Sequence, residues 1–189
     1  MAFEDYKTKD SVTIVYTGEG KGKTSASVGL LARSLGADWK VAFIQFIKNW
    51  QVSEHVFIDK IQPIYGEKLF FYKGGKGFYN AGAISEKDTT EADHKKAASD
   101  TYKIALEAVT SGEYNLVICD EINNAVNDKL ITEDQLKTLI ESKSSKTSLC
   151  LTGRNFPEKL LDKVDIATHM TKIKHHFDEK FLANEGIDY

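Results

Sequence analysis

Glycines alternate with polar residues in a short stretch near the N-terminus, where residues 17–24 read Thr-Gly-Glu-Gly-Lys-Gly-Lys-Thr. Closely spaced glycines let consecutive backbone N–H groups turn toward one anion, and a helix that follows adds the positive end of its dipole. In such a loop the lysine amine bridges phosphate oxygens, and the next hydroxyl binds Mg²⁺. The stretch therefore predicts a polyphosphate site with Lys23 and Thr24 as its reactive groups.

The elements on either side of this stretch decide between a P-loop and a glycine-rich surface turn. Residues 12–16 are β-branched and aromatic and predict a buried strand, whereas residues 23–35 have helical spacing. Strand, glycine loop, Lys-Thr and helix is the layout of a P-loop. The general pattern has a glycine where this chain has Thr17, but solvation alone does not explain Lys21 and Lys23 between glycines. We favour phosphate binding.

An acidic pair follows the apolar strand predicted at residues 116–119. Asp120 and Glu121 at the end of such a strand have a Walker-B-like arrangement, in which carboxylates hold a magnesium ion or orient a water molecule. The alternative is that Asp120 caps the helix after it. The P-loop upstream favours the metal site, with Thr24, Asp120 and Glu121 as the metal-binding residues.

Two further polar residues are expected at the same edge of the sheet, outside the carboxyl ends of the strands. Arg154 follows a strand predicted at residues 147–151, where its guanidinium can clamp phosphate oxygens. A surface salt bridge is the simpler alternative for it. Gln45 lies near the end of an apolar run at residues 41–47, and it either faces a ligand or is an amide satisfied at the end of a strand.

A loop rich in glycine and aromatic residues spans residues 73–82. It has too many glycines for regular structure and too many aromatic side chains for a plain linker, and loops of this kind are often functional. Phe78 and Tyr79 either pack on a flat ligand or anchor the loop to the core. The sequence leaves both interpretations open.

Strands and helices alternate along the 189 residues of the chain. Besides the elements above, we expect a short helix over 54–60, a strand over 69–72, helices with capping boxes over 90–111 and 132–142, a helix starting at 157, and a last strand over 166–170. The alternation predicts a three-layer, doubly wound and mostly parallel α/β sheet. We expect one domain over residues 1–189, with a loosely held arm over residues 1–10.

Composition excludes several classes of protein. A net charge of −3 argues against nucleic-acid binding, which normally leaves a basic excess. No apolar run is long enough to span a membrane, and the polar N-terminus predicts a cytoplasmic protein. Cys119 and Cys150 lie in apolar runs and are expected to be buried free thiols.

The motifs together resemble the ATP:corrinoid adenosyltransferases of the CobA/BtuR/CobO type. The matching segments occur in the order of the family and span nearly the whole chain: residues 16–24, 45–48, 120–123, 152–154, 174–175 and 186–189. This combination is far more specific than the P-loop alone. Two positions depart from the family, which usually has a tryptophan in place of Asn80 and a glutamate in place of His169.

The resemblance implies a P-loop NTPase fold of the RecA-like kind, usually in a homodimer. It implies transfer of the 5′-deoxyadenosyl group from ATP to the Co(I) centre of a reduced corrinoid, with release of inorganic triphosphate. ATP in this family lies the opposite way round from most P-loop enzymes, and a flavodoxin-type protein often supplies the electrons. Since the nucleophile belongs to the corrinoid, the protein needs no catalytic serine or cysteine, and the sequence shows no such constellation.

The resemblance also assigns roles to residues of this sequence. The expected catalytic residues are Lys23, Thr24, Glu121 and Arg154. The expected ATP-binding residues are Thr17, Gly18, Glu19, Gly20, Lys21, Gly22, Lys23, Thr24, Ser25 and Arg154. The expected corrinoid-binding residues are Gln45, Phe78, Tyr79 and Asn80, and Mg²⁺ is expected at Thr24, Asp120 and Glu121.

Two alternatives remain at this point. One is a P-loop ATPase or kinase that acts on another small molecule, because Glu121 stands where an ATPase places a carboxylate that orients water. The other is a nucleotide- or corrinoid-binding protein without turnover, which Asn80 suggests. The nature of the phosphate-containing product distinguishes the first alternative, and binding without product distinguishes the second.

Overall fold

The computed structural model describes residues 5–77 and 89–189 of the chain. Its centre is a sheet of six strands: β1 Thr13–Thr17, β2 Val41–Gln45, β3 Leu69–Lys73, β4 Leu116–Asp120, β5 Ser148–Thr152 and β6 Ile166–His169. The strands lie in the order β3-β2-β4-β5-β1-β6, and each neighbouring pair is parallel. This arrangement confirms the α/β class that the alternation of elements predicts.

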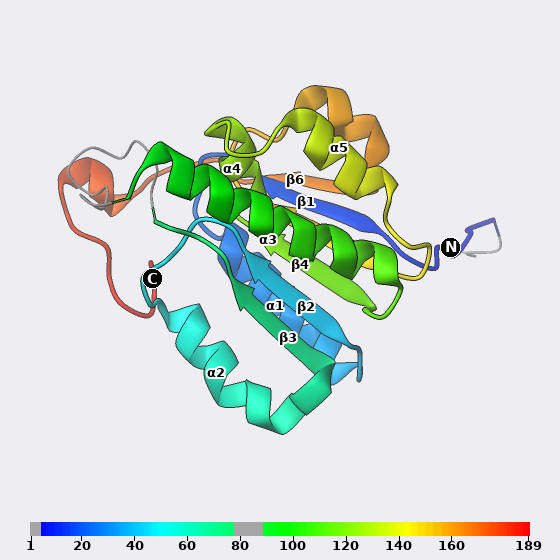
Figure 1. Cartoon of the computed structure of the whole chain (residues 1–189). Helices are drawn as coiled ribbons and strands as arrows, with labels where there is room; N and C mark the ends of the chain where they lie inside the picture. The colour runs from blue at the N-terminus through cyan, green and yellow to red at the C-terminus, as the bar shows by residue number, and fades with distance from the viewer. Residues whose placement is uncertain (1–4, 78–88) are drawn as a thin grey trace.

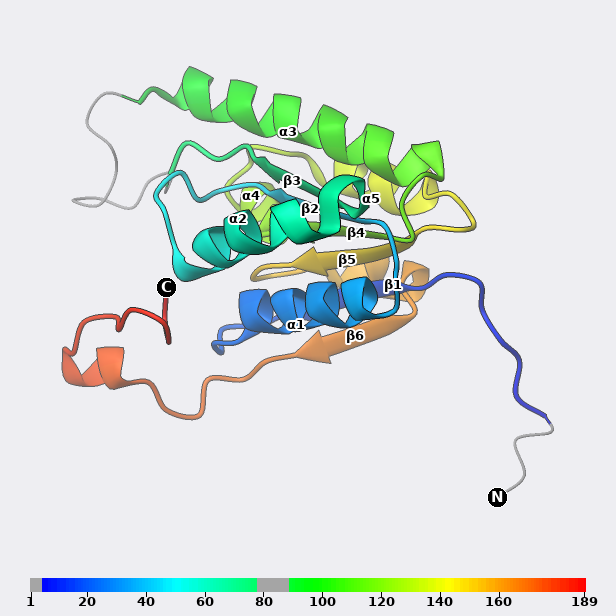
Figure 2. The same cartoon turned by 90° about the horizontal axis from the view of Figure 1, so that it is seen from below.

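Helices cover both faces of the sheet and complete the three layers (Figure 1, Figure 2). The α-helices are α1 Lys23–Gly36, α2 Ser53–Tyr65, α3 Glu91–Ser111, α4 Ile122–Asn127 and α5 Glu133–Glu141, and the 3₁₀ helices are η1 Gly66–Lys68, η3 Glu158–Lys163 and η4 His176–Glu179. The chain steps from β1 through β2 to β3 in one direction along the sheet, and from β3 to β6 in the other. Right-handed crossovers place connections of opposite direction on opposite faces, so α1 and α2 lie on one face and α3, α4 and α5 on the other.

Two apolar clusters, one on each face of the sheet, hold the layers together. Leu31 of α1 and Ile58 of α2 are fully buried in the cluster on the first face. On the second face, α3 contributes Ala105 and Val109, which the sequence places on the same side of that helix. Burial on both faces explains why the central strands are almost continuously apolar.

The helix termini follow the sequence closely. Both predicted capping boxes are present, with Thr90 accepting a hydrogen bond from the backbone N–H of Asp93 and Thr132 accepting one from that of Gln135. α3 ends at Gly112, which has a left-handed backbone with φ of 71°. These local signals fix where the long helices begin and end.

Boundaries near the loops differ from the predicted ones. β2 ends at Gln45 rather than at residue 47, because the chain turns away there to form the loop before α2. α2 is longer than predicted and continues past Pro63, which lies in its last turn. A 3₁₀ helix, not an α-helix, follows Pro157.

The remaining expectations concern the ends of the chain and the cysteines. Residues 5–10 are exposed and contain no helix or strand, and Lys9 pairs with Asp165. Cys119 and Cys150 are buried free thiols. Within residues 5–77 and 89–189, no helix is both long enough and apolar enough to cross a membrane.

Candidate active site

The P-loop connects β1 to α1 and takes a conformation that favours glycine. Gly18 and Gly22 have φ of 102° and 106°. A Cβ atom on Gly18 would lie 2.5 Å from the carbonyl oxygen of Met170, and the backbone N–H of Gly20 donates a hydrogen bond of 2.7 Å to the same oxygen. The segment after β6 therefore supports the loop from one side, and only glycines allow it to come so close.

Lys23 and Thr24 begin α1 at the carboxyl edge of the sheet. The Lys23 amine donates hydrogen bonds of 2.7 Å to the carbonyl oxygens of Gly18 and Gly20. Burial, with the nearby Arg154 guanidinium, lowers the pKa of Lys23 from its ordinary value. The amine thus lies inside the curve of the loop, where it can reach a bound phosphate group.

Asp120 ends β4 next to the P-loop and is fully buried. Its carboxylate accepts hydrogen bonds from the hydroxyl of Thr152 at 2.8 Å and from the side-chain amide of Gln45 at 2.9 Å. The Thr24 hydroxyl lies 3.3 Å from the same carboxylate. The residue at the N-cap of α4 is Glu121, so the alternative that Asp120 caps this helix is wrong.

Glu121 has a strained backbone and an incompletely paired carboxylate. It is left-handed, with φ of 62°, and its backbone N–H donates to the Thr152 hydroxyl at 2.9 Å. Its Oε2 atom is buried and has no hydrogen-bond partner in the part of the chain that the structure describes, while Oε1 lies 3.9 Å from the Lys48 amine. Burial raises the pKa of Glu121 to about 7, although the positive charge of Lys48 opposes this shift.

These groups suit a magnesium ion better than a metal with an all-protein cage. The described residues hold no cluster of three or more histidine, cysteine or carboxylate side chains that could bind a metal. Mg²⁺ needs only one or two carboxylates when substrate phosphates and water complete its shell. Thr24, Asp120 and Glu121 provide this donor set, and the unpaired oxygen of Glu121 is the atom that such an ion would satisfy.

Arg154 reaches the P-loop from the turn after β5. Its guanidinium Nε lies 3.3 Å from a carboxylate oxygen of Glu19, and both side chains are exposed. Its backbone N–H donates to the side chain of Asn124 at 2.8 Å, which fixes the turn against α4. The structure therefore places Arg154 beside the phosphate loop, in the surface ion pair that the sequence leaves as an alternative.

Comparison with known proteins identifies the family. Residues 9–189 match the family described as ATP:corrinoid adenosyltransferase BtuR/CobO/CobP. The chain belongs to this family. It is 32% identical over 178 residues to a corrinoid adenosyltransferase of Sinorhizobium sp, covering 93% of this chain and 79% of that protein. It is 27% identical over 179 residues to the corrinoid adenosyltransferase of Pseudomonas aeruginosa, covering 94% of this chain and 83% of that protein.

A solved structure supports the fold class independently. The flagellar accessory protein FlaH from Methanocaldococcus jannaschii has a TM-score of 0.54 with this chain and 14% sequence identity, over 85% of this chain and 71% of FlaH. At that identity the likeness shows the fold alone, and it confirms the predicted RecA-like P-loop architecture. Family membership makes the protein a transferase that adenosylates corrinoids with ATP.

The side chain of Gln45 faces the interior of the enzyme. It is fully buried, and its amide nitrogen and oxygen contact Asp120 and His55 respectively. The corrinoid contact expected for Gln45 therefore finds no support in this structure. The other expected corrinoid-binding residues, Phe78, Tyr79 and Asn80, lie outside the described residues.

The C-terminal residues return to the P-loop, a contact that the sequence does not reveal. The carboxylate of Asp188 lies 2.9 Å from the Lys21 amine and 3.4 Å from His176. A backbone hydrogen bond from Asn184, together with Lys21, lowers the pKa of Asp188 to about 2. The resemblance includes residues 186–189 but gives them no role.

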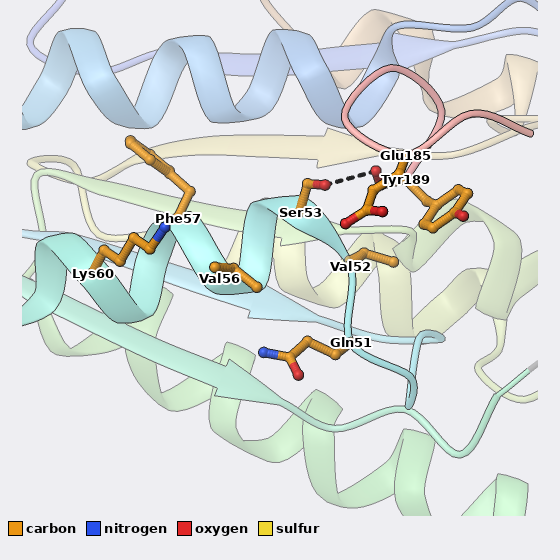
Figure 3. A pocket seen from close by; sticks show the side chains of 8 residues that line it. All are labelled: Gln51, Val52, Ser53, Val56, Phe57, Lys60, Glu185 and Tyr189. Carbon is orange, nitrogen blue, oxygen red and sulfur yellow. Dashed lines mark hydrogen bonds between the residues drawn. The ribbon is translucent and has the colours of Figure 1, made fainter.

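A pocket of about 540 Å³ lies between these C-terminal residues and the start of α2 (Figure 3). Its lining mixes apolar and charged side chains: Gln51, Val52, Ser53, Val56, Phe57, Lys60, Glu185 and Tyr189. None of them belongs to the P-loop or to the carboxylate pair. The pocket is therefore separate from the P-loop residues, although its C-terminal lining is close in sequence to Asp188, which pairs with Lys21.

Two residues in the first turn of α2 also reach the site, and sequence reasoning missed them. Glu54 lies 2.6 Å from the Lys48 amine, and His55 contacts Gln45. Both contacts depend on the path of the loop over residues 46–52, which carries no periodic signal. Only the polarity of Lys48 at the end of the strand gives a hint of them.

Proposed function

We propose that this enzyme transfers the 5′-deoxyadenosyl group of ATP to the Co(I) centre of a reduced corrinoid and releases inorganic triphosphate. The observation that carries the proposal is the convergence of Lys23, Thr24 and the carboxylates of Asp120 and Glu121 at one edge of the sheet. The family supplies the two substrates, and this arrangement supplies a grip on the polyphosphate rather than a protein nucleophile.

The bonds and electrons of the reaction balance without a further reactant. Co(I) donates an electron pair to the ribose C5′ carbon and is formally oxidised to Co(III) as the Co–C bond forms. The bond between C5′ and the α-phosphate oxygen breaks, and triphosphate leaves with that electron pair. The protein has to stabilise the negative charge that develops on the leaving group.

The residues of the P-loop edge fit that task. Lys23 would bind phosphate oxygens inside the loop, and Arg154 can leave its exposed pair with Glu19 to reach the same group. When bound, Mg²⁺ would be held by Thr24, Asp120 and Glu121 and would supply positive charge to the polyphosphate. The backbone N–H groups of the loop add fixed dipoles that need no reorganisation.

Anaerobic incubation with ATP, Mg²⁺ and chemically reduced cobalamin tests the proposal. We expect the spectrum of the corrinoid to change to that of a light-sensitive alkyl-cobalt species. Lys23→Ala should lower the rate by about 100-fold or more, because it removes a donor to the leaving group. Lys68→Ala, in an exposed pair with Asp38 on the surface, is the matched control and should react like the parent. Phosphate or ADP as the product would select an ATPase or kinase instead.

We also propose that the enzyme works as a cytoplasmic homodimer that receives Co(I) corrinoid through a flavodoxin-type reductant. These expectations rest on the family resemblance. Exposed apolar side chains after β6, such as Ile173 and Leu182, support a contact with a second copy. Sedimentation at several protein concentrations tests the dimer, and activity with reduced flavodoxin as sole electron source tests the reductant.

A further inference from the structure

The first turn of α2 directs three successive side chains to three different partners. The Ser53 hydroxyl donates to the carbonyl oxygen of Tyr189 at 2.7 Å, beside the pocket (Figure 3). Glu54 pairs with Lys48, and His55 contacts the side-chain oxygen of Gln45. Ser53 therefore faces the C-terminal residues, whereas the next two residues connect α2 to the carboxylate pair.

The hydrogen bonds from His55 to the P-loop can run in only one direction. Because a carboxylate only accepts hydrogen bonds, the amide nitrogen of Gln45 must face Asp120, and the amide oxygen must then face His55. An amide oxygen also only accepts, so the Nε2 atom of His55 carries the proton. The Asp120 carboxylate in turn accepts hydrogen bonds from the hydroxyls of Thr152 and Thr24.

Packing alone does not account for a histidine at this position. His55 is 3% exposed, and its ring lies against Phe71 with 5.6 Å between the ring centroids. Its Nδ1 atom is buried without a hydrogen-bond partner among the described residues, which is unfavourable. Burial also lowers its pKa, so the ring is neutral and donates only through Nε2. An apolar residue would fill the space at lower cost.

We propose that His55 is a positioning residue for the Mg²⁺–ATP site, acting through Gln45 on the carboxylate of Asp120. The proposal rests on the function proposed above, because it concerns the same metal site. Without the donor at position 55, the Gln45 side chain loses its second anchor and keeps only its hydrogen bond to Asp120. The amide is then held less firmly, and Asp120 is less firmly oriented toward Thr24.

Two variants separate this role from simple packing. His55→Phe fills the same space without a donor, whereas His55→Gln retains an N–H group that can reach Gln45. The readout is the Mg²⁺ concentration that gives half-maximal binding of a fluorescent ATP analogue, measured without corrinoid. We expect His55→Phe to raise this concentration about tenfold, as loss of an outer-shell contact typically does, and His55→Gln to restore most of the loss.

Ile58→Val is the matched control, since Ile58 is fully buried on the same helix and has no polar contact. It should reduce stability in urea while leaving the Mg²⁺ dependence like that of the parent. An unchanged Mg²⁺ dependence in His55→Phe, or equal losses in all three variants, would overturn the proposal. Absence of any Mg²⁺-dependent nucleotide binding in the parent would overturn both this proposal and the proposed function.

NMR of the unaltered protein labelled with ¹⁵N-histidine tests the same point if His55→Phe does not fold. We expect His55 as the neutral Nε2–H tautomer, with a resonance that shifts when Mg²⁺ is added to the ATP-bound protein. The opposite tautomer would contradict the hydrogen-bond direction. Failure of adenosyl transfer with these results intact would remove the proposed reaction and leave the role of His55 standing.

Discussion

The two neighbouring carboxylates of the site, those of Asp120 and Glu121, differ in their hydrogen-bond partners. Asp120 is surrounded by donors, namely the hydroxyl of Thr152 and the amide of Gln45. Glu121 has one buried oxygen without a partner in the described structure and only a distant amine at Lys48. Asp120 is therefore positioned by the protein, while Glu121 retains capacity to bind a cation.

The raised pKa of Glu121 predicts a pH dependence of stability in the protein without divalent cations. Burial raises this pKa from 4.5 to about 7, so the folded state binds the proton more tightly than the unfolded state. The stabilising contribution is complete below 4.5 and is lost as the pH rises through about 7. We expect the free energy of unfolding in urea to fall between about pH 5 and about pH 8, and to fall less in Glu121→Gln.

The control for this experiment is Glu67→Gln, which alters an exposed carboxylate in η1. It should retain the pH dependence of the parent. The same slope in Glu121→Gln as in the parent would show that Glu121 is not the group responsible.

Thr152 contacts both acidic residues of the site, and its hydroxyl offers a second test of their arrangement. It donates to Asp120 and accepts from the backbone N–H of Glu121. Thr152→Val should cost about 1–3 kcal/mol of stability, because a buried N–H loses its partner, and should weaken Mg²⁺–nucleotide binding. Thr147→Val is the matched control, since the buried Thr147 bonds the carbonyl oxygen of Tyr114 just before β5, away from the site.

Urea unfolding and nucleotide titration of both valine variants separate the two effects. We expect both to lose stability and only Thr152→Val to lose affinity. Equal loss of affinity in both would mean that strand stability, not the carboxylate contacts, controls binding.

At the level of elements, the loop after β3 packs so closely on the loop after β2 that it needs glycine. A Cβ atom on Gly75 would lie 2.1 Å from the carbonyl carbon and oxygen of Ile47. The adjacent residue is Lys48, which pairs with Glu54. Gly75→Ala should therefore displace the loop that carries Lys48, lower stability and weaken nucleotide binding.

Gly29→Ala is the opposite case and serves as the control. Gly29 lies in the middle of α1, and a Cβ atom there meets nothing within 4 Å. Because glycine in a helix interior is less stable than alanine, this variant should gain about 0.5–1 kcal/mol. Thermal unfolding of both variants measures the contrast, and a neutral Gly75→Ala would show that the loops can separate without cost.

Most of the elements could be predicted from sequence because their signals are local. The capping boxes at Thr90 and Thr132, and the glycine loop before α1, depend on residues a few positions apart. The length of α2 could not be predicted, because Pro63 signals an end, whereas the helix continues to Tyr65, which packs against the cluster on the first face. The inward path of the loop after Gln45 depends on contacts with β4, which no local pattern encodes.

Some residues of the candidate site could likewise be predicted from the sequence, and others could not. Asp120 and Glu121 lie at the end of β4, and Lys23 and Thr24 follow β1 after the glycine loop. A parallel sheet brings the ends of its strands to one edge, so these residues could be predicted to meet. The role of His55 could not be predicted, because it depends on an intervening amide.

At the level of the whole molecule, the C-terminal residues link the P-loop to α2. Asp188 pairs with Lys21, and the carbonyl oxygen of Tyr189 accepts from Ser53. Asp188→Ala should weaken ATP binding, because Lys21 loses its fixed position beside the loop. The expected change in stability is small, since the segment adds little to the core.

Asp178→Ala is the control on the same tail, where Asp178 pairs with Lys172 in an exposed position. Titration with a fluorescent ATP analogue and limited proteolysis of the tail provide the two readouts. We expect faster cleavage and weaker binding only in Asp188→Ala. Unchanged binding in that variant would mean that the C-terminal contact plays no part in holding nucleotide.

The proposed reaction requires the P-loop and the carboxylate pair to hold the polyphosphate as a leaving group, so that carbon is attacked and not phosphorus. Phosphorus-31 NMR of a quenched anaerobic reaction, with the alkyl-cobalt product counted in the same sample, tests this requirement. We predict one free triphosphate for each adenosylated corrinoid, with no ADP. Phosphate and ADP in place of triphosphate, or corrinoid adenosylation without triphosphate, would contradict the proposed reaction.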